Sequence, residues 1–136
     1  MNRCDLRHLR AGDIMTNKLQ WARPQESLRV AGQRMADFGL RALLVAGPEP
    51  DDLPGILTSK DIVNLLCTQE AAVLDQVTVA DVMTRPAICV PKQANMRDCL
   101  NLMRMSGVRR LPVLDGAKVV GILSSSDVFK HMLKEC

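Results

Sequence analysis

The sequence predicts an α/β chain (α+β in layout) in which one β-α-β-β-α unit occurs twice and the copies pack about a pseudo-twofold axis. The first observation is a repeated string, Gly-Ile-Leu-Ser/Thr-x-x-Asp, at residues 55–61 and 121–127. The second is a copy of Asp-aliphatic-Met-Thr ahead of each string, at residues 13–16 and 81–84. The third is composition: 47% of the residues are hydrophobic and only 2% aromatic, which favours an aliphatic core.

The two copies are predicted at residues 9–68 and 77–136, after an N-terminal segment at 1–8 and around a linker at 69–76. A half of roughly 55–65 residues has little core of its own. Because the linker is short, we expect the halves to bury apolar surface against each other instead of forming independent domains.

Each copy begins with a short strand and a helix. The strands are predicted in runs that end at proline, Leu19–Pro24 and Ala87–Pro91, because proline cannot donate to a ladder. The first run holds one extra residue. Apolar residues at helical spacing then predict a helix in each copy. They are Leu28, Ala31, Met35 and Phe38 in the first copy, and Met96, Cys99, Leu100 and Met103 in the second.

Both helices have start and stop signals. Ser27 or Glu26 is the expected N-cap of the first and Asn95 of the second. Gly39 and Gly107 fit the left-handed residue that ends a helix.

Two strands and a closing helix complete each copy. The first copy has strands at Ala42–Ala46 and Gly55–Leu57 around a surface loop, and the second has strands at Leu111–Leu114 and Lys118–Leu123 around an Asp-Gly hairpin turn. The closing helices are predicted to bury these apolar residues: Ile62, Val63, Leu65 and Leu66 in the first copy, and Val128, Phe129, Met132 and Leu133 in the second.

Composition excludes several classes of protein. The net charge of +3 is small and dispersed, which argues against nucleic acid as a partner. The longest apolar run, Ala42–Ala46, is far too short to span a membrane. The N-terminus has no apolar secretory region, so we expect a cytoplasmic protein. Its five cysteines lack Cys-x-x-Cys spacing and are expected to be reduced thiols.

No pattern of residues supports catalysis or metal binding. The chain has no Ser/His/Asp order, no Cys beside His, no metal-ligand spacing and no glycine-rich phosphate loop. We therefore expect no enzyme, no catalytic residue, no metal ligand and no required cofactor.

The repeated string predicts a strand that turns into a helix at Thr58 or Ser124. The hydroxyl and the N–H groups of the first helical turn suit an anion. The carboxylates of Asp61 and Asp127 accept two hydrogen bonds each and suit a vicinal diol such as a ribose. The combination favours a nucleoside. The alternative is that Thr58-x-x-Asp61 and Ser124-x-x-Asp127 are capping boxes and no more.

The order and spacing of these strings, met twice, resemble the CBS (cystathionine β-synthase) domain family, and two copies in tandem resemble a Bateman module. The resemblance implies clefts that bind AMP, ADP, ATP, S-adenosylmethionine or NAD, with AMP or ATP favoured. It places ribose contacts on the two aspartates and base contacts on Val108–Pro112 and Ile88–Pro91, with Leu40–Leu44 and Trp21–Pro24 as first-copy equivalents. The predicted ligand-binding residues are Ser124, Asp127, Arg109, Val108, Arg110, Leu111, Pro112, Ile88, Val90, Pro91, Thr58, Asp61 and Arg41.

The second copy matches the family pattern better than the first. It contains Leu111-Pro112-Val113, where the first copy has Leu43-Leu44-Val45. We therefore expect the better-formed site at Asp127. Arg41 and Arg109 occupy equivalent positions, and either could meet a phosphate or simply be solvated.

Two functions are compatible with these patterns. The first is a regulatory module, expected to form a homodimer, that binds an adenosine nucleotide and signals to an unknown effector protein. The alternative is a structural dimerisation module with no working ligand site.

Overall fold

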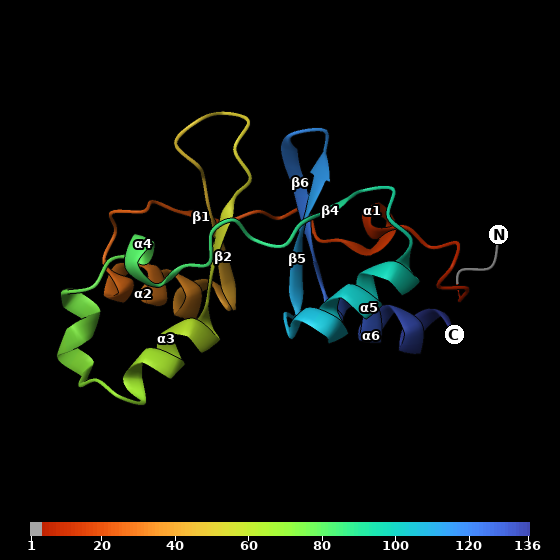
Figure 1. Ribbon diagram of the computed structural model, residues 1–136. Coiled ribbons are helices and arrows are strands. Elements are labelled where there is room, and N and C mark those ends of the chain that lie inside the picture. The colour runs from red at the N-terminus through yellow and green to blue at the C-terminus, as the bar shows by residue number, and fades with distance from the viewer. Residues whose placement is uncertain (1–3) are drawn as a thin grey trace. The chain divides into compact units, whose positions relative to one another are not determined.

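The computed structural model describes residues 4–136, so residues 1–3 of the predicted N-terminal segment lie outside it. Within the described part, the chain forms two compact units. Unit 1 combines residues 4–19 with residues 88–136, and unit 2 is residues 20–87. Each unit has a three-stranded sheet within the described residues (Figure 1). The mixed α/β fold predicted from the sequence is confirmed.

Unit 2 is built on a mixed sheet in the order β1-β2-β3. β1 runs parallel to β2, and β2 runs antiparallel to β3. Its elements are β1 (Trp21–Ala22), α2 (Leu28–Phe38), β2 (Ala42–Val45), β3 (Gly55–Thr58), α3 (Ser59–Leu66), the 3-10 helix η1 (Ala71–Asp75) and α4 (Val79–Val82).

Unit 1 repeats this plan in the order β4-β5-β6, with a bulge between Val113 and Leu114 of β5. Helices α5 and α6 lie on one side of its sheet (Figure 1). Its elements are α1 (Ala11–Ile14), β4 (Val90–Pro91), α5 (Met96–Ser106), β5 (Arg110–Asp115), β6 (Lys118–Ser124) and α6 (Ser125–Glu135).

The predicted start and stop signals of α2 and α5 are confirmed. The Ser27 hydroxyl, and not Glu26, caps α2 by accepting from the Val30 amide at 3.2 Å. Asn95 caps α5 in the same way through the Asp98 amide at 2.9 Å. Gly39 and Gly107 end the helices with φ of 64° and 77°, which glycine adopts without steric cost.

The strand register shows that the first copy has no extra residue before its first strand, so that expectation was wrong. Ala22 pairs with Val45, and Val90 pairs with Val113, so both members of the second pair are 68 residues beyond those of the first. The two prolines are therefore not equivalent, because Pro24 follows its strand whereas Pro91 lies within one.

Each unit has its own aliphatic core. The core of unit 2 contains Ala22, Leu28, Ala31, Met35, Leu43, Val45, Leu57 and Val79. The core of unit 1 contains Leu9, Ala11, Val90, Met96, Cys99, Met103, Leu111, Val113, Leu123 and Val128. The predicted helix faces are thus partly right. Phe38, Val63, Phe129 and Leu133 are 58–70% exposed, because each helix contacts its core along a narrower stripe than its apolar residues cover.

The opening segment of each sequence copy packs on the sheet of the other copy. Thr16 exchanges two backbone hydrogen bonds of 2.9 Å with Ile122 of β6, and Thr84 exchanges bonds of 2.9 and 3.0 Å with Ile56 of β3. The short helices before them bury Ala11 in unit 1 and Val79 in unit 2. The compact units therefore cut across the two sequence repeats.

This close approach explains the glycine that begins each repeated string. A Cβ on Gly121 would lie 2.9 Å from the Thr16 carbonyl oxygen and would also collide with the Met15 sulfur. A Cβ on Gly55 would meet the Thr84 carbonyl oxygen at 3.2 Å and the Met83 sulfur at 3.1 Å. The backbone can approach at these positions because no side chain stands in the way.

The expectation that all cysteines are reduced was wrong for two of them. Cys4 and Cys136 form a disulfide, with Cα atoms 5.8 Å apart, although they are 132 residues apart in the sequence. Cys67, Cys89 and Cys99 are not in disulfides. Burial raises the pKa of Cys89 and Cys99, and the Asp98 charge adds to the rise at Cys99. Spacing rules missed the disulfide because folding, and not sequence proximity, brings its cysteines together.

Between residues 4 and 136, every helix is either too short or too polar to cross a membrane.

Candidate functional site

The first repeated string forms the corner between β3 and α3 in unit 2. The Thr58 hydroxyl accepts from the Asp61 amide at 3.2 Å, and the Asp61 carboxylate accepts from the Thr58 amide at 2.8 Å. This is a complete capping box, so one oxygen of Asp61 is already in use. The structure thus supports the capping alternative for this corner.

The second string forms the equivalent corner between β6 and α6 in unit 1. The Ser124 hydroxyl accepts from the Asp127 amide at 3.1 Å and lies 3.2 Å from the Ser126 hydroxyl. Within the described residues, no hydrogen bond or ion pair involves the half-buried Asp127 carboxylate. Both carboxylate oxygens of Asp127 therefore remain able to accept hydrogen bonds, whereas one oxygen of Asp61 already accepts one from the Thr58 amide.

The arginines predicted to meet phosphate join these corners through their backbones. The Ser59 amide donates to the Arg41 carbonyl at 2.9 Å, and the Ser125 amide donates to the Arg109 carbonyl at the same distance. Arg41 and Arg109 are both exposed. Arg110 pairs with Ser124 across β5 and β6, and Val108 packs partly against the core.

Other predicted ligand contacts lie elsewhere in unit 1. Leu111 and Pro112 are buried, and Leu111 belongs to the core. Val90 and Pro91 pair with Val113 and Leu114, which is roughly 10 Å along β5 from Arg110. The described structure therefore does not bring Val90 and Pro91 to the Ser124 corner. Ile88, which precedes them, is 38% exposed.

The sequence reasoning missed one neighbour of this corner. Thr16 is exposed and pairs with Ile122, two residues before Ser124 on β6. Thr84 holds the corresponding position beside β3. The signal was present, because the Asp-aliphatic-Met-Thr string repeats with the corner string, but nothing in one sequence says which copy's sheet the string contacts.

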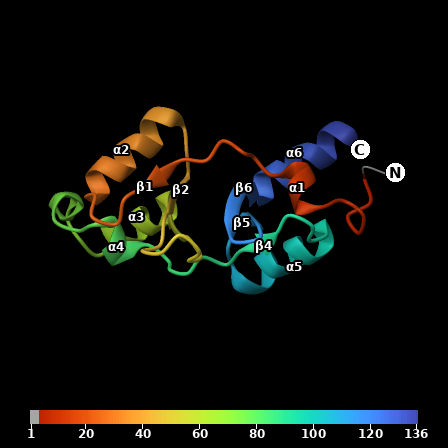
Figure 2. The same cartoon turned by 90° about the horizontal axis from the view of Figure 1, so that it is seen from above.

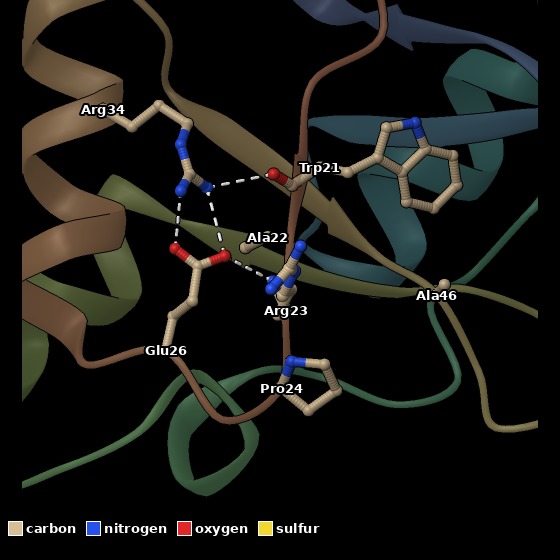
Figure 3. A pocket seen from close by; sticks show the side chains of 7 residues that line it. All are labelled: Trp21, Ala22, Arg23, Pro24, Glu26, Arg34 and Ala46. Atoms are coloured by element: carbon tan, nitrogen blue, oxygen red, sulfur yellow. Dashed lines mark hydrogen bonds and ion pairs between the residues drawn. The ribbon is translucent and has the colours of Figure 1, made fainter.

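Each unit also has an open pocket of about 580 Å³ away from its corner. The pocket of unit 1 is lined by Arg10, Gly12, Asp13, Met15, Lys92 and Gln93. The pocket of unit 2 is lined by Trp21, Ala22, Arg23, Pro24, Glu26, Arg34 and Ala46 (Figure 3). Neither lining includes the aspartate or the hydroxyl of a corner.

An ion pair organises the pocket of unit 2. Arg34 Nη2 donates to Glu26 Oε2 at 2.5 Å, and Arg34 Nη1 donates to the Trp21 carbonyl at 3.0 Å. Burial opposes the charge of Glu26, but hydrogen bonds from Arg34 and the Arg23 amide outweigh it and hold the pKa of Glu26 below its usual value. The indole of Trp21 points away from this pair (Figure 3). The charges of Glu26 and Arg34 are thus already paired with each other, and this pair holds the pocket wall in place.

Comparison with known proteins decides the family. The family model described as the CBS domain matches residues 11–67 and 79–134. The chain belongs to the CBS domain family. The resemblance predicted from the repeated strings is confirmed, and the chain is a CBS pair.

Two relatives of this CBS pair are similar over most of their length. Hypoxic response protein 1 of Mycobacterium tuberculosis is 35% identical over 124 residues, which cover 90% of this chain and 84% of that protein. The crystal structure of the CBS domain protein NE2398 is 34% identical, with a TM-score of 0.76 over 87% of this chain and 91% of that one.

A third likeness is in fold alone. The CBS domain pair of protein MJ0100, solved in complex with 5′-methylthioadenosine and S-adenosyl-L-methionine, has a TM-score of 0.80 at 22% identity, covering 94% of this chain and 98% of that one. By contrast, the chain spans 63% of MK0525, an uncharacterized Methanopyrus kandleri relative that is 26% identical over 92% of this chain.

One difference from a relative concerns metal. A structure of hypoxic response protein 1 is described with two coordinated zinc ions. In the described part of this chain, no three His, Cys, Asp or Glu side chains gather as a metal site.

Proposed function

We propose that this CBS pair is a regulatory module that binds an adenosine nucleotide at the β6–α6 corner of unit 1. The observation that carries the proposal is the half-buried Asp127 carboxylate, which has no hydrogen-bond partner among the described residues. A carboxylate without a partner can accept one hydrogen bond from each of the two hydroxyl groups of a ribose. Arg109 is exposed and joins the same corner through its carbonyl, which accepts from the Ser125 amide, so Arg109 and the Ser124 hydroxyl suit a phosphate.

The fold provides further support. A CBS pair of the same fold, the one in MJ0100, holds two adenosyl compounds. In this chain the β3–α3 corner of unit 2 is the weaker candidate, because the Thr58 amide already donates to one oxygen of the Asp61 carboxylate. We favour AMP or ATP over S-adenosylmethionine, which carries no phosphate, because the exposed Arg109 has no carboxylate partner among the described residues.

The proposed module is cytoplasmic, lacks catalysis and passes its signal to a separate effector protein. It is proposed to work as a homodimer. Exposed apolar side chains on α6, Phe129 at 64% and Leu133 at 70%, support pairing through helices. Sedimentation velocity of the wild type beside Phe129→Asp tests this pairing, and a wild type that stays monomeric at high micromolar concentration would contradict it.

The ligand is tested by thermal unfolding of nucleotide-free protein with AMP, ADP, ATP, S-adenosylmethionine or NAD at millimolar concentration. A ligand present at a hundred times its Kd stabilises the folded state by about 2.7 kcal/mol. We expect a shift with an adenosine nucleotide, its loss in Asp127→Asn, and its retention in the matched variant Asp61→Asn.

Two results would contradict this assignment. If no compound shifts the unfolding of wild-type protein, the structural dimerisation module is the better description. If Asp61→Asn abolishes the shift and Asp127→Asn keeps it, the ligand occupies the other corner.

A further inference from the structure

The disulfide joins the two ends of unit 1. Cys4 precedes the segment that leads to α1, and Cys136 follows α6. Cys136 is exposed and Cys4 is partly exposed, so small molecules in solution can reach the bond. The described start of the chain, in red, lies beside the end of α6 in both views (Figures 1 and 2). The bond therefore closes a covalent loop around almost the whole chain.

Residues 4–16, here called the strap, cross unit 1 from that bond to β6. The Leu6 carbonyl accepts from the Arg97 amide at 3.1 Å, and the Leu9 carbonyl accepts from the Met96 amide at 2.8 Å. Leu9 is 4% exposed and belongs to the core. At its far end, Thr16 pairs with Ile122. The strap is thus tied to the start of α5 and to β6 by hydrogen bonds, and to the end of α6 by the disulfide.

The residues nearest the two sulfurs have little packing around them, because Arg7, His8 and residues 133–136 are exposed. Segments with few buried side chains open locally unless something holds them. The last turn of α6 is exposed at Leu133, Lys134 and Glu135, so packing contributes little to its order. When the disulfide is closed, each end holds the other in place.

We propose that Cys4–Cys136 is a redox-sensitive clasp that controls the order of the strap and of the last turns of α6. The same helix carries Ser124 and Asp127 at its other end, about 16 Å away. The strap reaches β6 two residues before Ser124. The clasp therefore acts on β6 and α6, the two elements that form the Ser124 corner. It makes no contact with a ligand there, and this proposal does not depend on the proposed ligand.

The clasp opens by thiol–disulfide exchange with a small thiol. The thiolate of one small thiol attacks a sulfur of the disulfide, forms a mixed disulfide and releases the other cysteine as a thiolate. A second small thiolate then attacks the mixed disulfide and releases the first cysteine. Two small thiols supply the two electrons and leave as one oxidised disulfide, while the cysteine thiolates take up two protons. Oxidised small disulfides drive the same steps in reverse.

The remaining cysteines differ from this pair in position. Cys99 is buried in the core of unit 1, and burial raises its pKa, so its reactive thiolate is disfavoured. Cys67 is exposed but lies at the end of α3 in unit 2. Cys67→Ser is therefore a matched control that removes an accessible thiol without touching the clasp.

The test is hydrogen exchange, read by mass spectrometry on the full chain in oxidised glutathione and in dithiothreitol. We expect amides of residues 5–12 and 130–136 to exchange at least tenfold faster after reduction, while residues 28–45 of unit 2 do not change. The transition of unit 1 should lie roughly 5–15 °C higher in the oxidised protein, because the cross-link restricts the unfolded state of that unit. Cys4→Ser should behave as the reduced protein in both buffers, and Cys67→Ser as the wild type.

Three outcomes would overturn the clasp. Peptide mapping could find Cys4 and Cys136 as free thiols in oxidised glutathione, or in a bond between two chains. Exchange could be identical in the two buffers. Exchange could also rise equally in both units, which would make the disulfide a global stabiliser without local control.

Discussion

At the scale of single residues, Glu26 shows how one carboxylate orders a pocket wall. It receives hydrogen bonds from Arg34 and from the Arg23 amide, and its pKa lies below the usual 4.5. The folded state therefore keeps Glu26 charged at pH values where the unfolded chain has taken up a proton. Its contribution to stability is complete above pH 4.5 and is lost as the pH falls through the folded pKa.

The change Glu26→Gln should lower the free energy of unfolding of unit 2 by about 1–2 kcal/mol at pH 7, because a charged hydrogen bond is lost. The loss should shrink towards pH 3, where the wild-type carboxyl is protonated as well. Urea unfolding followed by Trp21 fluorescence measures this directly, since the single tryptophan lies in unit 2.

A matched control is Asp75→Asn, which removes the ion pair between Asp75 and Arg29. Both side chains are at least half exposed, so its effect should stay within about 0.5 kcal/mol. An equal loss at pH 3 and pH 7 for Glu26→Gln would show that the side chain acts through packing and not through charge.

The residue scale is also where prediction from sequence was weakest. Asp61 and Asp127 stand at the same place in two closely similar strings, yet one carboxylate closes a capping box and the other does not. A difference of this kind depends on a side-chain rotamer, which no spacing rule encodes. The bond between Cys4 and Cys136 was out of reach for a similar reason, because it depends on where both chain ends fold.

At the scale of elements, sequence reasoning did better. Helices α2 and α5 begin at the predicted caps Ser27 and Asn95 and end at the predicted glycines, because caps and left-handed residues are local chemistry. The short helices α1 and α4 were not predicted. Four residues carry too little periodicity to detect, and their order comes from burial of Ala11 and Val79.

The glycine before each corner gives a test at this scale. In Gly121→Ala the new methyl group would press on the Thr16 carbonyl and on Met15, so we expect a loss of about 1–3 kcal/mol. In Gly55→Ala the nearest atoms are farther away, at 3.1 and 3.2 Å, and the loss should be smaller.

Urea unfolding followed by circular dichroism compares the two variants with the wild type. A larger loss for Gly55→Ala than for Gly121→Ala would mean that Thr16 and Met15 move aside without cost. The pairing between Thr16 and Ile122 would then be looser than its two 2.9 Å hydrogen bonds indicate.

At the scale of the whole molecule, two identical plans exchange their opening segments. Unit 2 is one continuous stretch, residues 20–87, and it includes the buried Val79. The sequence repeat at residues 9–68 lacks that segment and leaves its place in the core empty. The repeat pattern reveals the duplication, but a pattern that looks the same in both copies cannot reveal the exchange.

A fragment of residues 20–87 should therefore unfold cooperatively on heating, whereas a fragment of residues 9–68 should lack a cooperative transition. Fragments of this size are marginally stable, so the loss of buried Val79 and its neighbours decides the outcome. Thermal scans by circular dichroism compare the two fragments, and Val79→Asp in the fragment of residues 20–87 is the control. Equal melting of both fragments would show that the exchanged segment adds nothing to the core.

The exchange also changes how inherited variation in such a gene should be interpreted. A substitution at Met15 is encoded early in the first repeat, but its neighbours are Gly121 and the strand around it. A destabilising substitution at Met15 would therefore disturb the sheet of unit 1, which is encoded mainly by the second repeat. A second substitution that compensates for a change at Met15 is then best sought near codon 121, and not among the codons that directly follow codon 15.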